Sequence, residues 1–347
     1  MQGTLLVGTA GQGILRSVDD GASWHRLGLK EAIEFDGVVR CLAVDPADPR
    51  RVFAGADCGI CLSTDGGAHF SRIASPADGM TVWAFAIDPR DPAVMYAGTG
   101  APSRAAMFRS LDGGASWVRL PPEIPEFCRG VNRPRILAIC VDPAVPGEVW
   151  FGVEEGGAWR SGDRGDTWTR VDQEGAREGA IANPDIHGIT ILGPADGHPK
   201  KTLVLSVNTV YASTDEGRTW AGEPSRLRFD GMYYTRTAQL LADGSALLLA
   251  IGDGTPGTRS HIYRSADRGA TWERALLHAA PNSTFWAFGT HAADPHFVLA
   301  GTKYGHLFRS MDGGRSWFKD WRDFSEITSV AWTPHVAPVH AHPQSIV

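Results

Sequence analysis

Side chains that could hold an anion and move protons recur along the chain beside short apolar segments. Arginine forks suit a carboxylate or a phosphate, and histidine, tyrosine and carboxylates can transfer protons to a bound ligand. The candidate catalytic residues are His187, Tyr234, Glu326 and Asp36. The candidate ligand-binding residues are Arg40, Trp83, Arg133, Arg135, Arg236, Asp253, Trp286, Tyr304 and His306.

These candidates lie between copies of an eight-residue pattern, S-x-D-x-G-x-[ST]-W, which occurs seven times. Only the second copy departs from it, with His69 and Phe70 in the last two positions. A period of 45 to 52 residues is typical of a propeller, in which each unit needs its neighbours to bury its faces. The motif aspartates are Asp19, Asp65, Asp112, Asp163, Asp215, Asp267 and Asp312.

Each period contains four short apolar or β-branched segments separated by Asp, Pro and Gly turns, as in "VVRCLAVDP", "RVFAGA", "GICLS" and "HFSRI". Four strands per unit predict a propeller blade. The motif then joins the third and fourth strands, where glycine supplies a positive φ and Ser and Asp hydrogen-bond the loop backbone. The closing tryptophan is expected to cover apolar surface between blades. We therefore expect the motif aspartates to be structural, and we call this motif the repeat turn.

The segment "EITSVAWTP", residues 326–334, parallels the first strands of other periods, whereas "TLLVGTA" near the N-terminus parallels a second strand. We therefore expect the C-terminal strand to complete the N-terminal blade, which closes the ring and removes its edges. The prediction is an all-β, seven-bladed propeller of antiparallel strands. It is one domain over residues 1–334, followed by a flexible tail over residues 335–347.

The candidate residues should share one face of this ring. The repeat turns and the "DP" turns after the first strands lie on one side. The opposite side carries the turns between second and third strands and the crossovers between blades, and we call it the crossover face. Loops of varied length converge there on the axis, where a pocket is expected. His187 and His306 should both point near that axis.

The repeat turn resembles the Asp-box, or BNR repeat, of sialidases, sortilin-type propellers, family 74 xyloglucanases and photosystem II assembly factors. A sialidase-like reaction would use Arg40, Arg135 and Arg236 on a carboxylate, Tyr234 with Glu326, and Asp36 or Asp185 as the acid. However, sialidases have six blades, and their Arg-Ile-Pro signature is absent near the N-terminus. Xyloglucanases of this type resemble two propellers clasping a glycan, and this chain supplies one. The resemblance implies the fold, because one scaffold hosts many activities.

Composition narrows the partners and the compartment. The net charge of −6 argues against nucleic acid and anionic membrane surfaces, and no apolar run approaches the ~18 residues that span a bilayer. The N-terminus lacks a signal-peptide pattern, and five cysteines fit a reducing cytoplasm, so we expect a cytoplasmic protein. Cys58 and Cys61 have no second pair, which favours structural thiols. No metal or cofactor is predicted.

Two functional hypotheses remain open. In the first, the axial pocket binds a small anionic metabolite or saccharide and acts as a non-sialidase hydrolase or lyase. Arg135 and Arg236 would grip the anion, His187 or Tyr234 would move protons, and Glu326 would orient one of them. In the second, the crossover face is a scaffold that docks a protein partner through its tryptophans and arginines.

Overall fold

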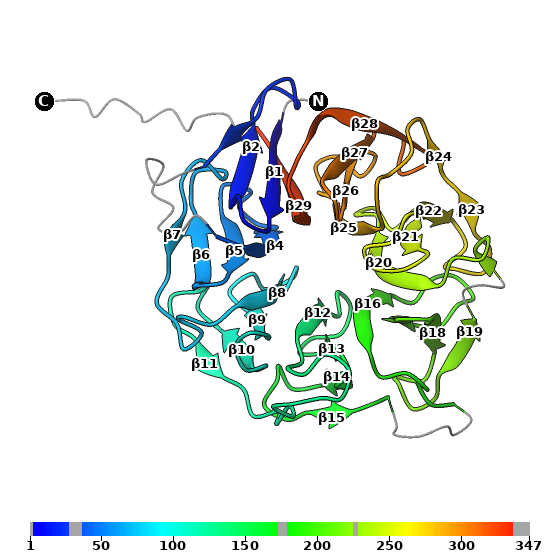
Figure 1. Ribbon diagram of the computed structural model, residues 1–347. Helices are drawn as coiled ribbons and strands as arrows, with labels where there is room; N and C mark the ends of the chain where they lie inside the picture. The colour runs from blue at the N-terminus through cyan, green and yellow to red at the C-terminus, as the bar shows by residue number, and fades with distance from the viewer. Residues whose placement is uncertain (1–2, 28–36, 173–178, 225–227, 336–347) are drawn as a thin grey trace, which may run out of the picture.

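The computed structural model describes residues 3–27, 37–172, 179–224 and 228–335. The named elements in these residues are all β-strands, which form seven sheets around a central axis (Figure 1). Each sheet is a blade with four antiparallel strands, and the last blade gains a short fifth strand in parallel. The predicted seven-bladed, all-β propeller is confirmed.

The inner two strands of each blade lie nearest the axis. The innermost strands are β29 (Ile327–Pro334), β4 (Val39–Val44), β8 (Val82–Ile87), β12 (Ile136–Val141), β16 (Ile186–Leu192), β20 (Tyr234–Leu240) and β25 (Phe285–Gly289). The second strands are β1 (Gly3–Thr9), β5 (Val52–Ala56), β9 (Met95–Thr99), β13 (Val149–Val153), β17 (Lys201–Ser206), β21 (Leu247–Gly252) and β26 (Val298–Thr302). The second strands are almost fully buried, because neighbouring blades cover both of their faces.

The outer two strands of each blade flank the repeat turn. The third strands are β2 (Ile14–Ser17), β6 (Gly59–Ser63), β10 (Met107–Ser110), β14 (Gly157–Ser161), β18 (Thr209–Ser213), β22 (Ser260–Ser265) and β27 (His306–Ser310). The outermost strands are β3 (His25–Arg26), β7 (Ser71–Arg72), β11 (Val118–Arg119), β15 (Thr169–Arg170), β19 (Ala221–Pro224), β23 (Glu273–Arg274) and β28 (Ser316–Asp323). The short strand β24 (Leu276–Leu277) runs parallel to β28.

The ring closes as expected, because β29 pairs with β1 in a register that places Leu5 opposite Trp332. The closing strand begins at Ile327, one residue after the predicted start. It brings the two ends of the described chain into one blade (Figure 1). Residues 336–347 of the predicted tail lie outside the described residues.

The core consists of apolar layers between neighbouring blades. Phe53 on β5 packs with Met95 on β9 and with Trp117, the tryptophan that ends the third repeat turn. Trp117 lies edge-on against Phe85, with ring centroids 5.7 Å apart. Buried apolar surface of this kind is the main stabilising contribution to folding, at about 25 cal/mol per Å². The expected role of the motif tryptophan between blades is confirmed at this position.

Every repeat turn is held by the same hydrogen bonds. In all seven copies the serine hydroxyl donates to the aspartate Oδ1 at 2.7–2.8 Å and accepts from the glycine N–H at 2.7–2.8 Å. The closing Ser or Thr hydroxyl donates to the second carboxylate oxygen in six copies, and the ring of His69 replaces it in the second. The glycine φ lies between 81° and 95° in each copy, so glycine is required there.

Basic side chains then link one blade to the repeat turn of the next. Arg309 on β27 donates to the Asp20 carbonyl at 2.6 Å, and Arg264 on β22 donates to the Gly313 carbonyl at 2.9 Å. Where a third strand lacks this arginine, a residue from its neighbouring turn or strand reaches over instead, as Arg51 and Lys201 do. The face with the repeat turns is therefore closed by its own hydrogen bonds. No helix in the described ranges has the length and hydropathy to cross a bilayer.

Candidate functional site

Each inner strand carries a β-bulge near its start. The register between the innermost and second strands skips one residue in all seven blades, so that residue has no cross-strand partner. A bulge re-aims a side chain and is often found beside a functional site. The seven bulged residues, which we call the axial ring, are Thr328, Arg40, Trp83, Leu137, His187, Arg236 and Trp286.

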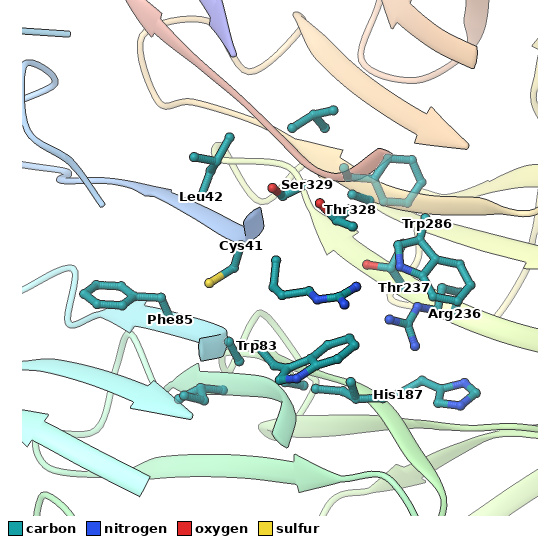
Figure 2. Close-up of a pocket in the computed structure, with 18 residues that line it drawn as sticks. Cys41, Leu42, Trp83, Phe85, His187, Arg236, Thr237, Trp286, Thr328 and Ser329 are labelled. Atoms are coloured by element: carbon teal, nitrogen blue, oxygen red, sulfur yellow. The ribbon is translucent and has the colours of Figure 1, made fainter. Parts of the chain in front are cut away.

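All seven members of the axial ring line one cavity of about 280 Å³ at the centre of the propeller. This volume is close to the lower end of the range for small-molecule sites, roughly 300–1,000 Å³. Figure 2 shows Trp83, His187, Arg236 and Trp286 around this space, with Thr328 and Ser329 on its upper wall. No aspartate or glutamate is among the described residues that line it.

Two arginines of the axial ring lie on two tryptophans of the same ring. The Arg40 guanidinium is 4.0 Å from the ring centroid of Trp83, and the Arg236 guanidinium is 3.8 Å from that of Trp286. The indole faces attract the cations and hold them in place. The Trp83 ring is itself fixed, because its Nε1–H donates to the Ala101 carbonyl at 2.8 Å.

Each indole also contacts a second cation, and that cation has a carboxylate partner. Arg135 lies 5.1 Å from the Trp83 centroid and forms an ion pair with Glu154. Lys303 lies 4.4 Å from the Trp286 centroid and pairs with Glu326 at 2.7 Å. These two cations are therefore neutralised within the protein.

Arg40 and Arg236, in contrast, form no ion pair with a carboxylate of the described residues. The Arg40 Nε is buried without a hydrogen-bond partner. Burial is the main cause that lowers the pKa of Arg40; among the nearby charges, Glu326 has the largest effect and raises the pKa, Arg135 and Arg236 lower it, and Asp57 raises it. The pocket thus holds two cations that form no ion pair with a carboxylate of the described residues.

His187 and Tyr234, the two candidates for moving protons, lie side by side with ring centroids 5.0 Å apart. The His187 Nδ1 is 2.8 Å from the Thr235 carbonyl oxygen, which can only accept, so Nδ1 carries a proton. The His187 Nε2 lies 3.4 Å from the Asp185 carboxylate. Burial raises the pKa of Tyr234 and outweighs the opposing effects of the Arg236 charge and a hydrogen bond with Thr255. At pH 7 the tyrosine is therefore a neutral proton donor.

Glu326 does not meet Tyr234, although the sequence suggested that it would orient a catalytic residue. Glu326 precedes β29 and pairs with Lys303, whereas Tyr234 begins β20, and β25 lies between those two inner strands. Asp36, the remaining catalytic candidate, lies outside the described residues.

Besides Arg135, which contacts Trp83 and pairs with Glu154, four of the predicted ligand-binding residues do not line the axial cavity. His306 begins β27, two strands away from the axis, and its Nε2 lies 3.7 Å from Asp323 on the outermost strand. The expectation that His306 points near the axis is therefore wrong. Tyr304 is 54 % exposed on the turn before it. Arg133 pairs with Glu126 at 3.3 Å in a crossover between blades.

The fourth, Asp253, organises its own turn. It accepts hydrogen bonds from the N–H groups of Thr258 and Arg259 and from the Thr258 hydroxyl. Burial alone would raise the pKa of Asp253, but these hydrogen bonds outweigh it and lower the pKa to about 2. Asp253 is thus an ionised cap for the loop after β21.

Sequence reasoning missed two members of the axial ring, Leu137 and Thr328, and the rim cation Lys303. An apolar or small residue does not suggest chemistry when it is considered by itself. Alignment of the seven periods would have found Leu137 and Thr328, because they occupy the same position as Arg40 and Trp83. Lys303 sits in a turn and had no comparable signal.

Comparison with known proteins gives relatives but no matching family model. The chain is 30% identical over 276 residues to a xyloglucanase of Hypocrea jecorina, which covers 69% of this chain and 32% of the relative. It is 28% identical over 277 residues to a xyloglucanase of a Paenibacillus species, covering 69% and 26%. The chain therefore spans about a third or less of the curated relatives that it matches.

Solved structures support the fold alone, because their sequence identities are low. The GH74 enzyme of Niastella koreensis superposes with a TM-score of 0.64 at 18% identity, covering 92% of this chain and 46% of that one. A Lactobacillus plantarum protein gives 0.65 at 12% identity, covering 96% and 99%. YCF48 bound to D1 peptide gives 0.53 at 16% identity, covering 82% of each chain. The chain is a seven-bladed propeller with xyloglucanase relatives.

Proposed function

We propose that the axial pocket binds a small anionic metabolite or an acidic saccharide. The observation that carries this proposal is the state of Arg40 and Arg236, which enter the pocket without a carboxylate partner among the described residues. A partly desolvated charge is costly unless an opposite charge compensates it. A carboxylate or phosphate of the ligand would supply that charge through a paired, charge-assisted hydrogen bond.

The xyloglucanase relatives favour a saccharide as the ligand. A neutral glycan would be expected to stack on exposed indole faces, but Trp83 and Trp286 each already contact two cations. The tryptophans thus serve to place guanidinium groups, which favours an acidic sugar over a neutral one. This site would distinguish the chain from its relatives.

The proposal has a second step, in which the pocket cleaves a bond of the bound ligand. Arg236 would hold the acid group of the ligand, and His187 and Tyr234 would be the proton-moving pair. Glycoside hydrolysis usually needs two carboxylates beside the bond, and the described pocket wall carries none. A lyase reaction therefore suits the wall better than a two-carboxylate hydrolase.

A specific observation favours the alternative, in which the crossover face docks a protein. Phe127, on the crossover between β11 and β12, is 57 % exposed, and Tyr304, on the turn between β26 and β27, is 54 % exposed. Large exposed apolar side chains beside arginines are typical of interface anchors. This alternative would use the rim, whereas the main proposal uses the cavity.

Isothermal titration with oligogalacturonates and with neutral xyloglucan oligosaccharides tests the proposal. We expect the acidic sugar to bind and the neutral sugar to bind at least tenfold more weakly. Arg236→Met should weaken the acidic sugar by about 10- to 100-fold, the usual effect of losing a charged hydrogen bond. Arg119→Met, on the exposed outermost strand β11, is the matched control. Equal binding of both sugars, or an unchanged affinity in Arg236→Met, would contradict the proposal.

A further inference from the structure

The axial pocket contains the same arrangement twice. In each copy, one indole contacts an unpaired arginine and a second cation that is paired with a glutamate. The first copy consists of Arg40, Trp83, Arg135 and Glu154. The second copy consists of Arg236, Trp286, Lys303 and Glu326. We call these two groups the cation clamps.

The unpaired arginines of the two cation clamps lie on opposite sides of the axis. Around the ring the inner strands follow the order β29, β4, β8, β12, β16, β20 and β25. Arg40 on β4 and Arg236 on β20 are separated by two strands in one direction and by three in the other. This is the largest separation that a ring of seven allows, and both arginines line the same cavity.

Each clamp fixes its unpaired guanidinium in the same way. The two guanidinium-to-indole distances are 4.0 Å and 3.8 Å, and in each clamp the neighbouring glutamate is already committed to the other cation. A guanidinium that is held flat on an indole has lost much of its side-chain freedom before a ligand arrives, which lowers the entropic cost of binding. The guanidinium groups of Arg40 and Arg236 are therefore both preorganised for binding the ligand.

Electrostatics then sets the charge of the ligand. Two guanidinium groups without an ion-pair partner among the described residues border the cavity. A ligand with one negative charge can neutralise one of them, while a ligand with two can neutralise both. The buried Oγ of Ser329, on the same wall, has no hydrogen-bond partner and could donate to the ligand.

We propose that the axial pocket is selective for a dianion that both cation clamps contact at the same time, either a dicarboxylate or a phosphate monoester. This inference rests on the proposed function and adds to it the charge of the ligand and the simultaneous use of Arg40 and Arg236. A singly charged uronate would occupy one clamp and leave the other without a counter-charge.

Four six-carbon probes of matched size test the charge requirement by titration calorimetry. They are glucarate with two carboxylates, glucose 6-phosphate with one phosphate monoester, glucuronate with one carboxylate, and neutral glucose. We expect at least one dianion to bind tenfold or more tightly than glucuronate, and glucose to bind most weakly. Glucarate as the better ligand would assign one carboxylate to each clamp, and glucose 6-phosphate would place a single phosphate between them.

Variants test the simultaneous contact. Arg40→Met and Arg236→Met should each lower dianion affinity at least tenfold, to about the level of glucuronate, while changing glucuronate affinity less than threefold. Arg119→Met is the control, and melting curves of the free variants check that each one is folded. Added salt should weaken dianion binding more steeply than monoanion binding.

The outcomes separate this inference from the proposed function. If glucuronate binds as tightly as both dianions and loses affinity in Arg236→Met, the dianion inference fails and the anion-binding function stands. If either arginine variant leaves dianion affinity unchanged, the simultaneous contact is wrong. If none of the four probes binds at millimolar concentration, both the inference and the proposed small-anion site are overturned.

Discussion

The repeat turns and the axial pocket differ in how their polar groups are paired. At the repeat-turn end, the serine hydroxyl, the aspartate and the glycine N–H bond one another in every blade. In the wall of the axial cavity, the Arg40 Nε and the Ser329 Oγ are buried without a partner. Both features, the repeat turn and the bulge, occur once in every blade. The repeat turn stabilises the fold, whereas the bulged position carries a different side chain in most blades.

The difference also lies in what the chain repeats. The repeat turn keeps the same residues from blade to blade, while the bulge keeps only a backbone geometry and changes the side chain. The bulge in each inner strand directs one side chain into the axial cavity. Because the bulged residue has no cross-strand partner, its side chain can change without loss of the hydrogen bonds between the strands. The Ser, Asp and Gly groups of the repeat turn bond one another, whereas the unpartnered Arg40 Nε and Ser329 Oγ belong to residues that line the cavity a ligand would fill.

The largest expected effect is at a buried charge network on the repeat-turn side. The Glu148 side chain is 2 % exposed; it accepts from Arg160 at 2.9 Å and from the Trp150 indole at 2.7 Å, and it pairs with Lys200. Glu148→Ala removes the buried acceptor that Arg160, Lys200 and Trp150 share, and among the described residues it leaves Arg160 only Glu216 and Lys200 only Asp142 as carboxylate partners. We expect the free energy of unfolding to fall by about 3–5 kcal/mol, measured by urea denaturation.

A matched control for Glu148 is available in the same cluster. Glu216 also contacts Arg160, at 3.2 Å, but its side chain is 50 % exposed. Glu216→Ala should change stability by less than about 1 kcal/mol. Equal losses in the two variants would mean that burial does not decide the effect.

The next effect concerns a single repeat turn. The Ser213 hydroxyl donates to Asp215 and accepts from the Gly217 N–H, both at 2.8 Å. Ser213→Ala leaves that buried N–H without its acceptor, so we expect a loss of about 1–3 kcal/mol in urea denaturation. Thr214→Ala, at the exposed variable position beside it, should stay within about 0.5 kcal/mol. A Ser213→Ala protein as stable as the Thr214→Ala protein would contradict the assigned role.

The axial ring should respond in the opposite sense. Arg40→Met removes a charge that has no carboxylate partner and leaves no buried group without its partner, although it loses the contact with Trp83. We expect stability within about 1 kcal/mol of the parent protein, in the same urea experiment. A loss above about 2 kcal/mol would show that the ring is part of the scaffold and would remove the distinction between the repeat turns and the axial pocket.

The smallest expected effect is the contribution of Asp112 to stability at acid pH. The hydroxyl and N–H of Ser116 bond Asp112 and, with Ser110, lower the pKa of that carboxyl to about 2. A lowered folded-state pKa stabilises the protein above the unfolded value near 4, and this contribution is lost as pH falls from about 4 to about 2. Asp112→Asn should therefore show a slightly shallower fall of Tm over that interval. Parallel Tm curves for the two proteins would rule out this contribution.

Most of the fold could be predicted, because the period, the four segments per period and the offset "EITSVAWTP" strand each determine part of the ring. The residues of the candidate site could be predicted only in part from the sequence. Arg40, Trp83, His187, Arg236 and Trp286 line the pocket as expected, because they start inner strands. The expectation for His306 was wrong because the distance of a side chain from the axis depends on whether its strand is first, second or third in the blade. His306 begins a third strand. Pairing choices, such as Glu326 with Lys303, depend on side-chain packing that residue type does not encode.

The pairing of β29 with β1 has a consequence for biosynthesis. Roughly 300 residues separate β3 from β29, and at about 5–20 residues per second a ribosome needs roughly 15 to 60 s to make them. During that interval β1 presents an open edge to other chains in the cell. A ribosome-bound chain stalled before Ile327 should therefore be cut by protease in its first blade sooner than in its middle blades. The N-terminal blade, whose strands are synthesised first, is therefore the last blade to be completed.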